Sequence, residues 1–254
     1  IGFYREEKDI QAANKSFLIT FFAASIMLAG FIMVYLDTGT FNLDKLRGTV
    51  ISDFVFLLIF TGIMAKSCIF PLHTWLPSAT VAPTPVTAFL HAAVLVKIGI
   101  YGFARFFNYT FYVPQIVTTY IPLLIVISTI IAGFSALRET DMKKILAYST
   151  ISQLGFILLG LTFVSDIGIT GALLFVLAHA LGKTGLFLCT GIIEYKTGVR
   201  DITKLGGMMK TLPITGTAFL LCALSVAGIP PLVGFWGKFL IVTAPIKEGQ
   251  FILA

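Results

Sequence analysis

The chain has 254 residues, of which 57% are hydrophobic and only 12% are charged, and its mean hydropathy is +0.95. Because soluble domains carry about a quarter charged residues, this composition excludes an ordinary water-soluble enzyme and favours a membrane protein. The net charge of +6 would suit a nucleic-acid partner. Most of the basic residues, however, lie in the short connections between apolar runs. We therefore expect a lipid bilayer, and no nucleic acid, around this chain.

Seven apolar runs follow one another, each close to the roughly 20 residues that cross a bilayer as a helix. They cover residues 15–36, 51–70, 86–107, 116–137, 145–164, 168–193 and 212–233. Backbone groups in hydrocarbon must be hydrogen-bonded within the segment, and alternating strands of about ten residues are not visible, so these runs predict helices. The expected fold is an all-α, polytopic transmembrane bundle of about seven spans, forming one domain over residues 1–254.

Basic residues are unevenly divided between the two sides of this bundle. When the connections are numbered alternately, one side holds Arg5, Lys8, Lys15, Arg138, Lys143, Lys144, Lys196, Arg200, Lys204 and Lys210, and the other holds Lys45, Arg47 and Arg105. An excess of Lys and Arg marks the cytoplasmic side of a membrane protein. We expect an integral protein of the cell (inner) membrane, with the N-terminus and the 137–144 and 194–211 connections in the cytoplasm.

The cysteines and the start of the chain add two expectations. Cys68, Cys189 and Cys222 lie inside apolar runs without metal-ligand spacing, so neither a disulfide nor a metal site is expected. The opening residues are charged and do not begin with Met, which is not typical of a signal peptide. They resemble the end of a preceding helix followed by a loop, so we expect the chain to be part of a larger subunit.

Two of the apolar runs are interrupted by proline. The second run breaks at Pro71 and the seventh at Pro230 and Pro231, where the ring removes a backbone donor and clashes with the preceding turn. Interrupted helices at corresponding places in two halves of a chain indicate an ion or substrate site. The alternative is that these prolines only kink the helices and shape their packing.

Similar segments also suggest an internal repeat. The first and sixth runs both end in a Tyr-containing segment that closes on a glycine, Gly39 and Gly198, and the next run of each then carries a proline break. We predict that residues 15–107 end a first repeat and that residues 116–244 form a second repeat that is incomplete at its C-terminus.

Four lysines lie within or beside the apolar runs, namely Lys66, Lys97, Lys183 and Lys238. A lysine at the centre of a membrane helix costs about 2.5–3.5 kcal/mol, so four would cost on the order of 10 kcal/mol without partners. Either pairing or a hydrated interior must offset that cost. The alternative is that the side chains reach an interface, which fits Lys238 best.

Histidines accompany these lysines. His179 and Lys183 lie four residues apart on one helical face, and His91 precedes Lys97 by six residues. Because histidine changes charge near neutral pH, such groups can pass a proton stepwise, each protonation affecting the next. The alternative for each histidine is a hydrogen bond between helices.

His73 and Asp141 are secondary candidates. His73 lies beside the first break, where it is either a site residue or a helix-end donor, and Asp141 lies in a cytoplasmic turn, where a loop or cap role is expected. No carboxylate falls in the middle of a run to hold a bare Na⁺, and lysines repel cations, so the set favours proton transfer.

Five segments carry a resemblance to a known family. They are residues 66–77 (KSCIFPLHTWLP), 82–86 (APTPV), 91–99 (HAAVLVKIG), 141–155 (DMKKILAYSTISQLG) and 227–239 (AGIPPLVGFWGKF). The chain resembles, over essentially its whole length, the antiporter-like subunits shared by respiratory complex I, Mrp-type Na⁺/H⁺ antiporters and membrane-bound hydrogenases, including the A-type and D-type Mrp subunits.

The resemblance implies a fold of about fourteen helices with two inverted five-helix repeats, each with one broken helix, of which this chain would supply the sixth to twelfth helices. It implies that Lys66 is the proton-carrying lysine of the first broken helix and Lys238 the exit-side lysine of the second. His91, Lys97, His179 and Lys183 match the connecting positions. The family pairs the first lysine with a glutamate on a preceding helix, which Glu6 and Glu7 do not replace, so flanking chain or another polypeptide is expected to supply it.

The expected function is that of a proton-translocating, antiporter-like subunit, itself non-catalytic, in a larger ion-pumping complex with other membrane subunits. No cofactor is expected in this chain, and iron–sulfur clusters or other redox centres would belong to partner subunits. One alternative is the Na⁺/H⁺ exchange subunit of an Mrp-type antiporter, and another is a structural subunit that does not conduct ions. A redox enzyme is disfavoured because the sequence has no cysteine cluster, haem motif or nucleotide-binding loop.

Overall fold

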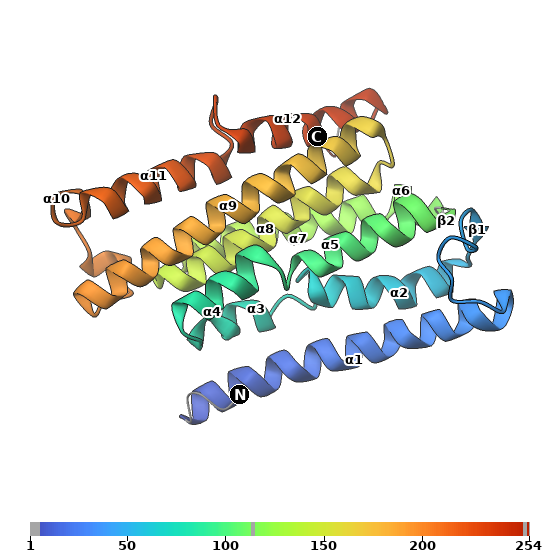
Figure 1. The fold of residues 1–254 in the computed structure, drawn as a ribbon, viewed down its shortest axis with the longest axis horizontal. Helices are drawn as coiled ribbons and strands as arrows, with labels where there is room; N and C mark the ends of the chain where they lie inside the picture. Colours follow the sequence, from blue (N-terminus) through green and yellow to red (C-terminus); the bar gives the residue numbers. More distant parts are fainter. Residues whose placement is uncertain (1–5, 113–114, 251–252, 254) are drawn as a thin grey trace.

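The computed structural model describes residues 6–112, 115–250 and 253, and these form an elongated helical bundle (Figure 1). Five helices are long and apolar enough to cross a membrane by length and composition. They are α1 (Glu7–Thr38), the composite helix Thr84–Thr110, the segment Val117–Arg138 that contains α7 (Ile121–Arg138), α8 (Met142–Thr162) and α9 (Asp166–Thr197). The prediction of an all-α, polytopic membrane fold is confirmed.

Two further crossings are built from half-helices, as the prolines predict. The first consists of α2 (Asp53–Lys66), an irregular segment, α3 (Trp75–Ser78) and the 3₁₀ turn η1 (Ala79–Val81). The second consists of α11 (Pro213–Ala227) and α12 (Val233–Lys247). Its second half extends beyond the expected run 212–233, so Lys238 lies inside helix α12 and not after the end of the crossing.

The third crossing contains a break that the sequence does not predict. The expected run 86–107 is divided into α4 (Thr84–Ala88), η2 (Phe89–Ala93), α5 (Lys97–Phe103) and η3 (Ala104–Thr110), of which η2 and η3 are π-helical. Helical structure is interrupted at residues 94–96, which contain neither proline nor glycine, so no local residue signals it. Lys97 begins the helix that follows this interruption.

Short elements close the two ends of the bundle. At one end lie the start of α1, the α7–α8 turn and the loop that carries η4 (Ile202–Lys204) and α10 (Met208–Thr211), and we call this the basic end (Figure 1). At the other end, β1 (Thr49–Val50) pairs in parallel with β2 (Phe111–Tyr112), next to α6 (Gln115–Thr119). Successive connections thus lie at opposite ends of the bundle, as the sequence predicts.

Helices α1 and α9 end in the same way. Each is 32 residues long and is followed by a glycine in the left-handed conformation, Gly39 with φ 71° and Gly198 with φ 69°. A residue with a side chain rarely adopts this conformation, so glycine is suited to end these helices. The shared length and cap agree with an internal repeat, which stays a prediction.

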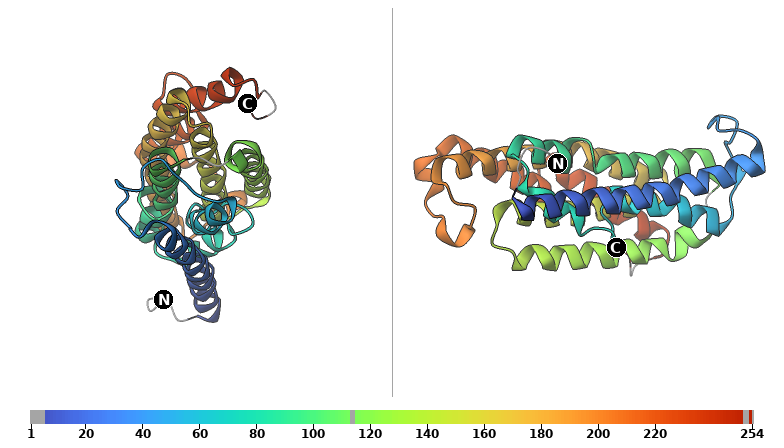
Figure 2. Two further views of the ribbon diagram at one scale, coloured as in Figure 1. Left: turned by 90° about the vertical axis from the view of Figure 1, so that its right-hand side faces the viewer. Right: turned by 90° about the horizontal axis from the view of Figure 1, so that it is seen from below.

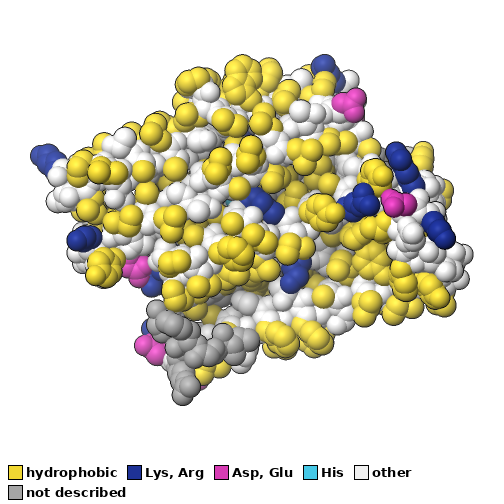
Figure 3. Space-filling model, in the orientation of Figure 1, with side chains coloured by type: hydrophobic (Ala, Val, Ile, Leu, Met, Phe, Trp, Pro, Cys, Tyr) yellow, Lys and Arg dark blue, Asp and Glu magenta, His cyan; other side chains and the backbone are white. Residues whose placement is uncertain are grey.

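The core lies between α2, α5, α7, α8 and α9. Buried Phe56 and Phe60 of α2 pack on Phe103 and Phe107 across the interface, with ring centroids 4.6 Å apart for Phe56 and Phe107. By contrast α1 lies at the edge of the bundle, as Figure 2 shows, and only 17% of its most apolar stretch is buried. Hydrophobic side chains are spread across the face shown in Figure 3, as expected for a surface in contact with lipid or neighbouring helices.

Candidate functional site

The first broken helix presents Lys66 at its break. Lys66 lies in the last turn of α2, half-buried, where the carbonyl end of a helix favours a positive charge. The irregular segment after it is held from both sides, because Trp75 Nε1 donates to the Ala65 carbonyl oxygen at 2.9 Å and the Phe70 N–H donates to Ser128 Oγ of α7 at 2.9 Å. Pro71 lies in this segment, where the sequence predicts the break.

Lys97 lies next to this break from the third crossing. Its amino group is buried and has no hydrogen-bond partner in the described part of the chain. Two residues further on, Gly99 packs so closely that a side chain there would overlap the hydroxyl group of Ser67, which directly follows α2. The interruption before Lys97 therefore lies against the interruption after Lys66. His73, half-buried beside the first break, also has a buried and unpartnered Nδ1.

The centre of the bundle contains two fully buried histidines and one fully buried lysine. His91 packs on Phe187 with ring centroids 5.2 Å apart, and His179 packs on Phe175 at 6.4 Å. Neither ring nitrogen of either histidine has a hydrogen-bond partner among residues that the structure describes. Among the described residues, neither His91 nor His179 therefore forms the hydrogen bond between helices that was the alternative role.

Lys183 is the fully buried lysine of this central group, and its amino group donates one hydrogen bond, to the Leu146 carbonyl oxygen of α8 at 3.1 Å. This carbonyl also accepts from Thr150 Oγ1 at 2.8 Å. An ammonium group has three donors, so this carbonyl uses only one of them.

The second broken helix holds Lys238 in a similar relation to its break. Its amino group reaches back from α12 and donates to the Ala227 carbonyl oxygen, the last of α11, at 3.2 Å. It also lies 5.1 Å from the ring centroid of Phe156 and 5.3 Å from that of Phe175. Helix ends and aromatic faces both favour a cation, so each broken helix offers a lysine a place at its carbonyl end. Pro230 and Pro231 occupy the gap between the half-helices.

These groups lie close enough to affect one another electrostatically. The charges of Lys97, Lys183 and Lys238 all act on His179, and the charge of Lys183 acts on His91. Within residues 6–112, 115–250 and 253, none of Lys66, Lys97, Lys183 and Lys238 forms an ion pair with a carboxylate. A carbonyl oxygen at Lys183, and a carbonyl oxygen and two aromatic rings at Lys238, therefore offset burial there in place of opposite charges.

Asp141 belongs to the basic end and not to this central group. Its side chain caps α8, accepting from the backbone N–H groups of Lys143 at 2.8 Å and Lys144 at 3.2 Å. It also pairs with Asp201 through a single antiparallel bridge that joins the start of α8 to the loop after α9. This is the cap role that the sequence allows for.

One charged cluster was not expected from the sequence. Lys143 is buried, with 1% of its side chain exposed, and its amino group lies 2.9 Å from Glu194 Oε2. Arg200 bonds the other oxygen of the same carboxylate, and the Thr84 hydroxyl lies 3.4 Å from Oε2. This cluster joins α8, α9 and the start of α4. The one feature of the sequence that points to it is Glu194, an acidic residue at the end of the apolar run 168–193.

The whole chain is similar to known membrane proteins. Residues 1–254 match the protein family described as NADH:quinone oxidoreductase/Mrp antiporter, transmembrane. The chain is 39% identical over 273 residues to the A subunit of a Na⁺/H⁺ antiporter from Bacillus subtilis (strain 168), covering 100% of this chain and 34% of that protein. It is 38% identical over 273 residues to the protein of the same name from Alkalihalophilus pseudofirmus, covering 97% of this chain and 33% of that protein.

A solved structure is also similar. The chain superimposes on a chain of the Mrp complex from Dietzia sp. DQ12-45-1b with a TM-score of 0.89 and 30% sequence identity. The match covers 96% of this chain and 46% of that chain. This chain therefore spans about a third of the curated relatives and about half of the structural match.

Proposed function

This chain belongs to the NADH:quinone oxidoreductase/Mrp antiporter family of transmembrane subunits, and from that premise we propose that it carries protons through a larger Mrp-type membrane complex. It is an integral membrane protein with antiporter-like architecture. What we propose is the ion that it transports, the residues along the path of that ion, its orientation in the membrane and its partner subunits. Its basic end would face the cytoplasm, and the other chains of the complex would surround it in the membrane.

One observation carries the proposal. Lys97, Lys183 and Lys238 all lie within electrostatic reach of His179, Lys238 also acts on Lys183, and none of these lysines is paired with a carboxylate within the described residues. A group that is buried and basic but not neutralised can gain or lose a proton at modest cost. Lys66 at the first break and His91 beside Lys183 would extend this series.

Electrostatic coupling lets a proton move along the series. When one amine is protonated, its charge disfavours protonation of the next, so a proton that arrives displaces one further along. Moving one charge against 100 mV requires about 2.3 kcal/mol. Since a tenfold change in proton affinity corresponds to about 1.4 kcal/mol, a change of less than a hundredfold at one lysine is sufficient.

The relatives favour exchange with Na⁺ over redox-driven pumping. The Bacillus and Alkalihalophilus proteins are both named as Na⁺/H⁺ antiporter subunits, and the structural match is to an Mrp complex. Because cationic lysines repel Na⁺, we assign to this segment the proton limb of such an exchange.

The test uses the full-length protein with its membrane partners in everted vesicles, where addition of Na⁺ collapses a preformed proton gradient. Lys183→Met and Lys238→Met should each lower this activity at least tenfold, because a thioether cannot carry a proton. Lys144→Met, a change to an exposed lysine at the basic end, is the matched control and should leave activity unchanged.

Three outcomes separate the alternatives. Unchanged exchange in both central lysine variants would refute proton transfer through this segment. Proton movement that persists without Na⁺ and follows an electron donor would favour a redox-driven pump. A complex that assembles and stays active without any of the four lysines would leave this segment with a structural role.

A further inference from the structure

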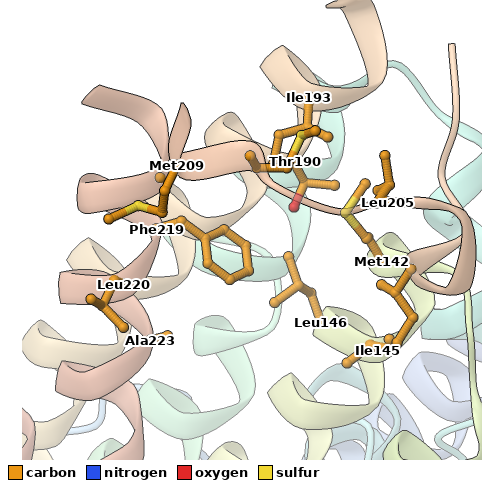
Figure 4. Close-up of a pocket in the computed structure, with 13 residues that line it drawn as sticks. Met142, Ile145, Leu146, Thr190, Ile193, Leu205, Met209, Phe219, Leu220 and Ala223 are labelled. Carbon is orange, nitrogen blue, oxygen red and sulfur yellow. The ribbon is translucent and has the colours of Figure 1, made fainter. Parts of the chain in front are cut away.

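Two adjoining cavities lie between the basic end and Lys183. The first, which we call the vestibule, is about 480 Å³ and lies between α8, α9 and α11, with Met142, Leu205 and Met209 among its walls (Figure 4). The second, the lysine chamber, is about 330 Å³ and includes Ser149, Gln153 and Lys183. Ile145, Leu146, Phe219 and Ala223 line both cavities, so the vestibule and the chamber share a wall.

The lysine chamber has unused hydrogen-bonding groups. Gln153 Oε1 is buried and has no partner in the part of the chain that the structure describes, and an unmatched buried acceptor costs about 1–3 kcal/mol. Ser149 lies one turn before Gln153 on α8, and Lys183 donates only one hydrogen bond. Since a water takes about 30 Å³ in the liquid, the chamber has room for several that would satisfy these groups.

The vestibule is almost entirely apolar and begins at the basic end. Met142 opens α8, while Leu205, Met208 and Met209 belong to the loop and short helix between α9 and α11. Figure 4 shows the ring of Phe219 extending from α11 into the space that faces Leu146 of α8. Apolar side chains that meet across such a passage can block water and ions by drying and can open with a small side-chain movement.

The far side of the lysine chamber meets the second broken helix. Ala227 lines the chamber, and its carbonyl oxygen accepts the hydrogen bond from Lys238. The chamber is therefore bordered both by Lys183 and by the residue whose carbonyl oxygen holds Lys238. A proton that reaches the chamber would meet the middle of the lysine series without passing Lys66.

We propose that the vestibule and the lysine chamber are a proton inlet of their own, leading from the basic end to Lys183, with Phe219 and Leu146 as its gate. Gln153 and Ser149 position the water chain, and the proton passes from a hydronium ion to the neutral amine of Lys183, leaving water and an ammonium group. The inlet rests on the proposed function, because it supplies the same lysine series.

The first test measures access, independently of transport. In the full-length protein with Cys68, Cys189 and Cys222 replaced by alanine, Ser149→Cys is exposed to a membrane-impermeant methanethiosulfonate ammonium reagent on the basic side of everted vesicles. Leu177→Cys is the control, since Leu177 is 55% exposed on the outer face of α9. We expect Ser149→Cys to react at least tenfold faster than the control, and faster still with Phe219→Ala.

Labelling of Ser149→Cys no faster than that of Leu177→Cys, even with Phe219→Ala, would overturn the inlet. The second test addresses Gln153. Gln153→Leu should lower proton flux about tenfold while Gln153→Glu, which still binds water, should retain most of it. An equal loss in both variants would indicate a packing role and refute the positioning role.

The two proposals fail in different ways. Loss of exchange in Lys183→Met together with absent labelling would refute only the inlet. Normal exchange in that variant together with fast labelling would show a water-filled passage and refute the proton route proposed above.

Discussion

The Lys143–Glu194 pair offers the sharpest test of what stabilises the bundle. Lys143 is 1% exposed and Glu194 is 23% exposed, and the carboxylate is the shared partner of Lys143 and Arg200. Glu194→Gln keeps the shape of the side chain and removes its charge. The change leaves a buried ammonium group beside a second cation with nothing to neutralise either.

Removing one partner of a buried ion pair costs about 3–5 kcal/mol. The amide oxygen of glutamine can still accept one hydrogen bond from Lys143, and the cavity beside the pair, about 490 Å³, admits water. We therefore expect a loss near the lower limit, about 3 kcal/mol. The double variant Glu194→Gln with Lys143→Met should recover most of it, because it removes the buried charge along with its partner.

The measurement is the free energy of unfolding of the full-length protein in mixed micelles titrated with dodecyl sulfate. Lys144→Met is the matched control, since Lys144 is the next residue, is exposed and forms no ion pair among the described residues, and it should shift stability by less than about 0.5 kcal/mol. The reasoning fails if Glu194→Gln and Lys144→Met destabilise the protein equally, or if the double variant is less stable than Glu194→Gln alone.

Three further predictions concern packing and caps. Gly99→Ala would place a methyl group that overlaps the Ser67 hydroxyl and lies 2.9 Å from the Ile63 carbonyl oxygen, so thermal unfolding should show a loss of about 1–3 kcal/mol. The control Gly133→Ala, whose new methyl group would have its nearest atom 4.0 Å away, should leave stability unchanged. Asp141→Ala removes the acceptor for two backbone N–H groups at the start of α8 and should cost about 1 kcal/mol, while Asp141→Asn should retain most of the stability. Hydrogen bonds from Thr203 hold the pKa of Asp201 below its usual 3.8. The carboxylate cap on the 202–204 turn is therefore intact above pH 3.8 and is lost as the pH falls through the lowered pKa. Cleavage of this loop by pepsin should rise as the pH falls through the lowered pKa of Asp201, and in a Thr203→Val variant, which lacks the hydroxyl donor, the rise should begin at a higher pH.

Local chemistry was sufficient to predict the membrane fold and its two proline breaks. Apolar runs of span length can satisfy their backbone only as helices, and proline cannot continue a helix, so α2 and α11 end before Pro71 and Pro230. Basic residues inside such runs can likewise be found in the sequence, because a charged side chain stands out among apolar neighbours. The sequence therefore identified Lys66 and Lys238, the lysines at the two breaks, as candidates.

The partners of those residues depend on how the helices pack. The break at residues 94–96 has no proline or glycine, and it appears only where the third crossing packs against the end of α2 through Gly99. Likewise Lys143 and Glu194 are ordinary charged residues near helix ends until α8 and α9 meet and bury the amine.

The sequence by itself determined that this protein is a helical membrane bundle with interrupted helices and buried amines, because span length, proline and charge act within a few residues of one another. Only the tertiary structure decided that Lys238 is held by the end of α11, that Lys183 borders a chamber with Gln153, and that Phe219 faces Leu146. These relations join residues on different helices, and burial, cavities and electrostatic reach are set by how helices pack and not by the order of residues along any one of them.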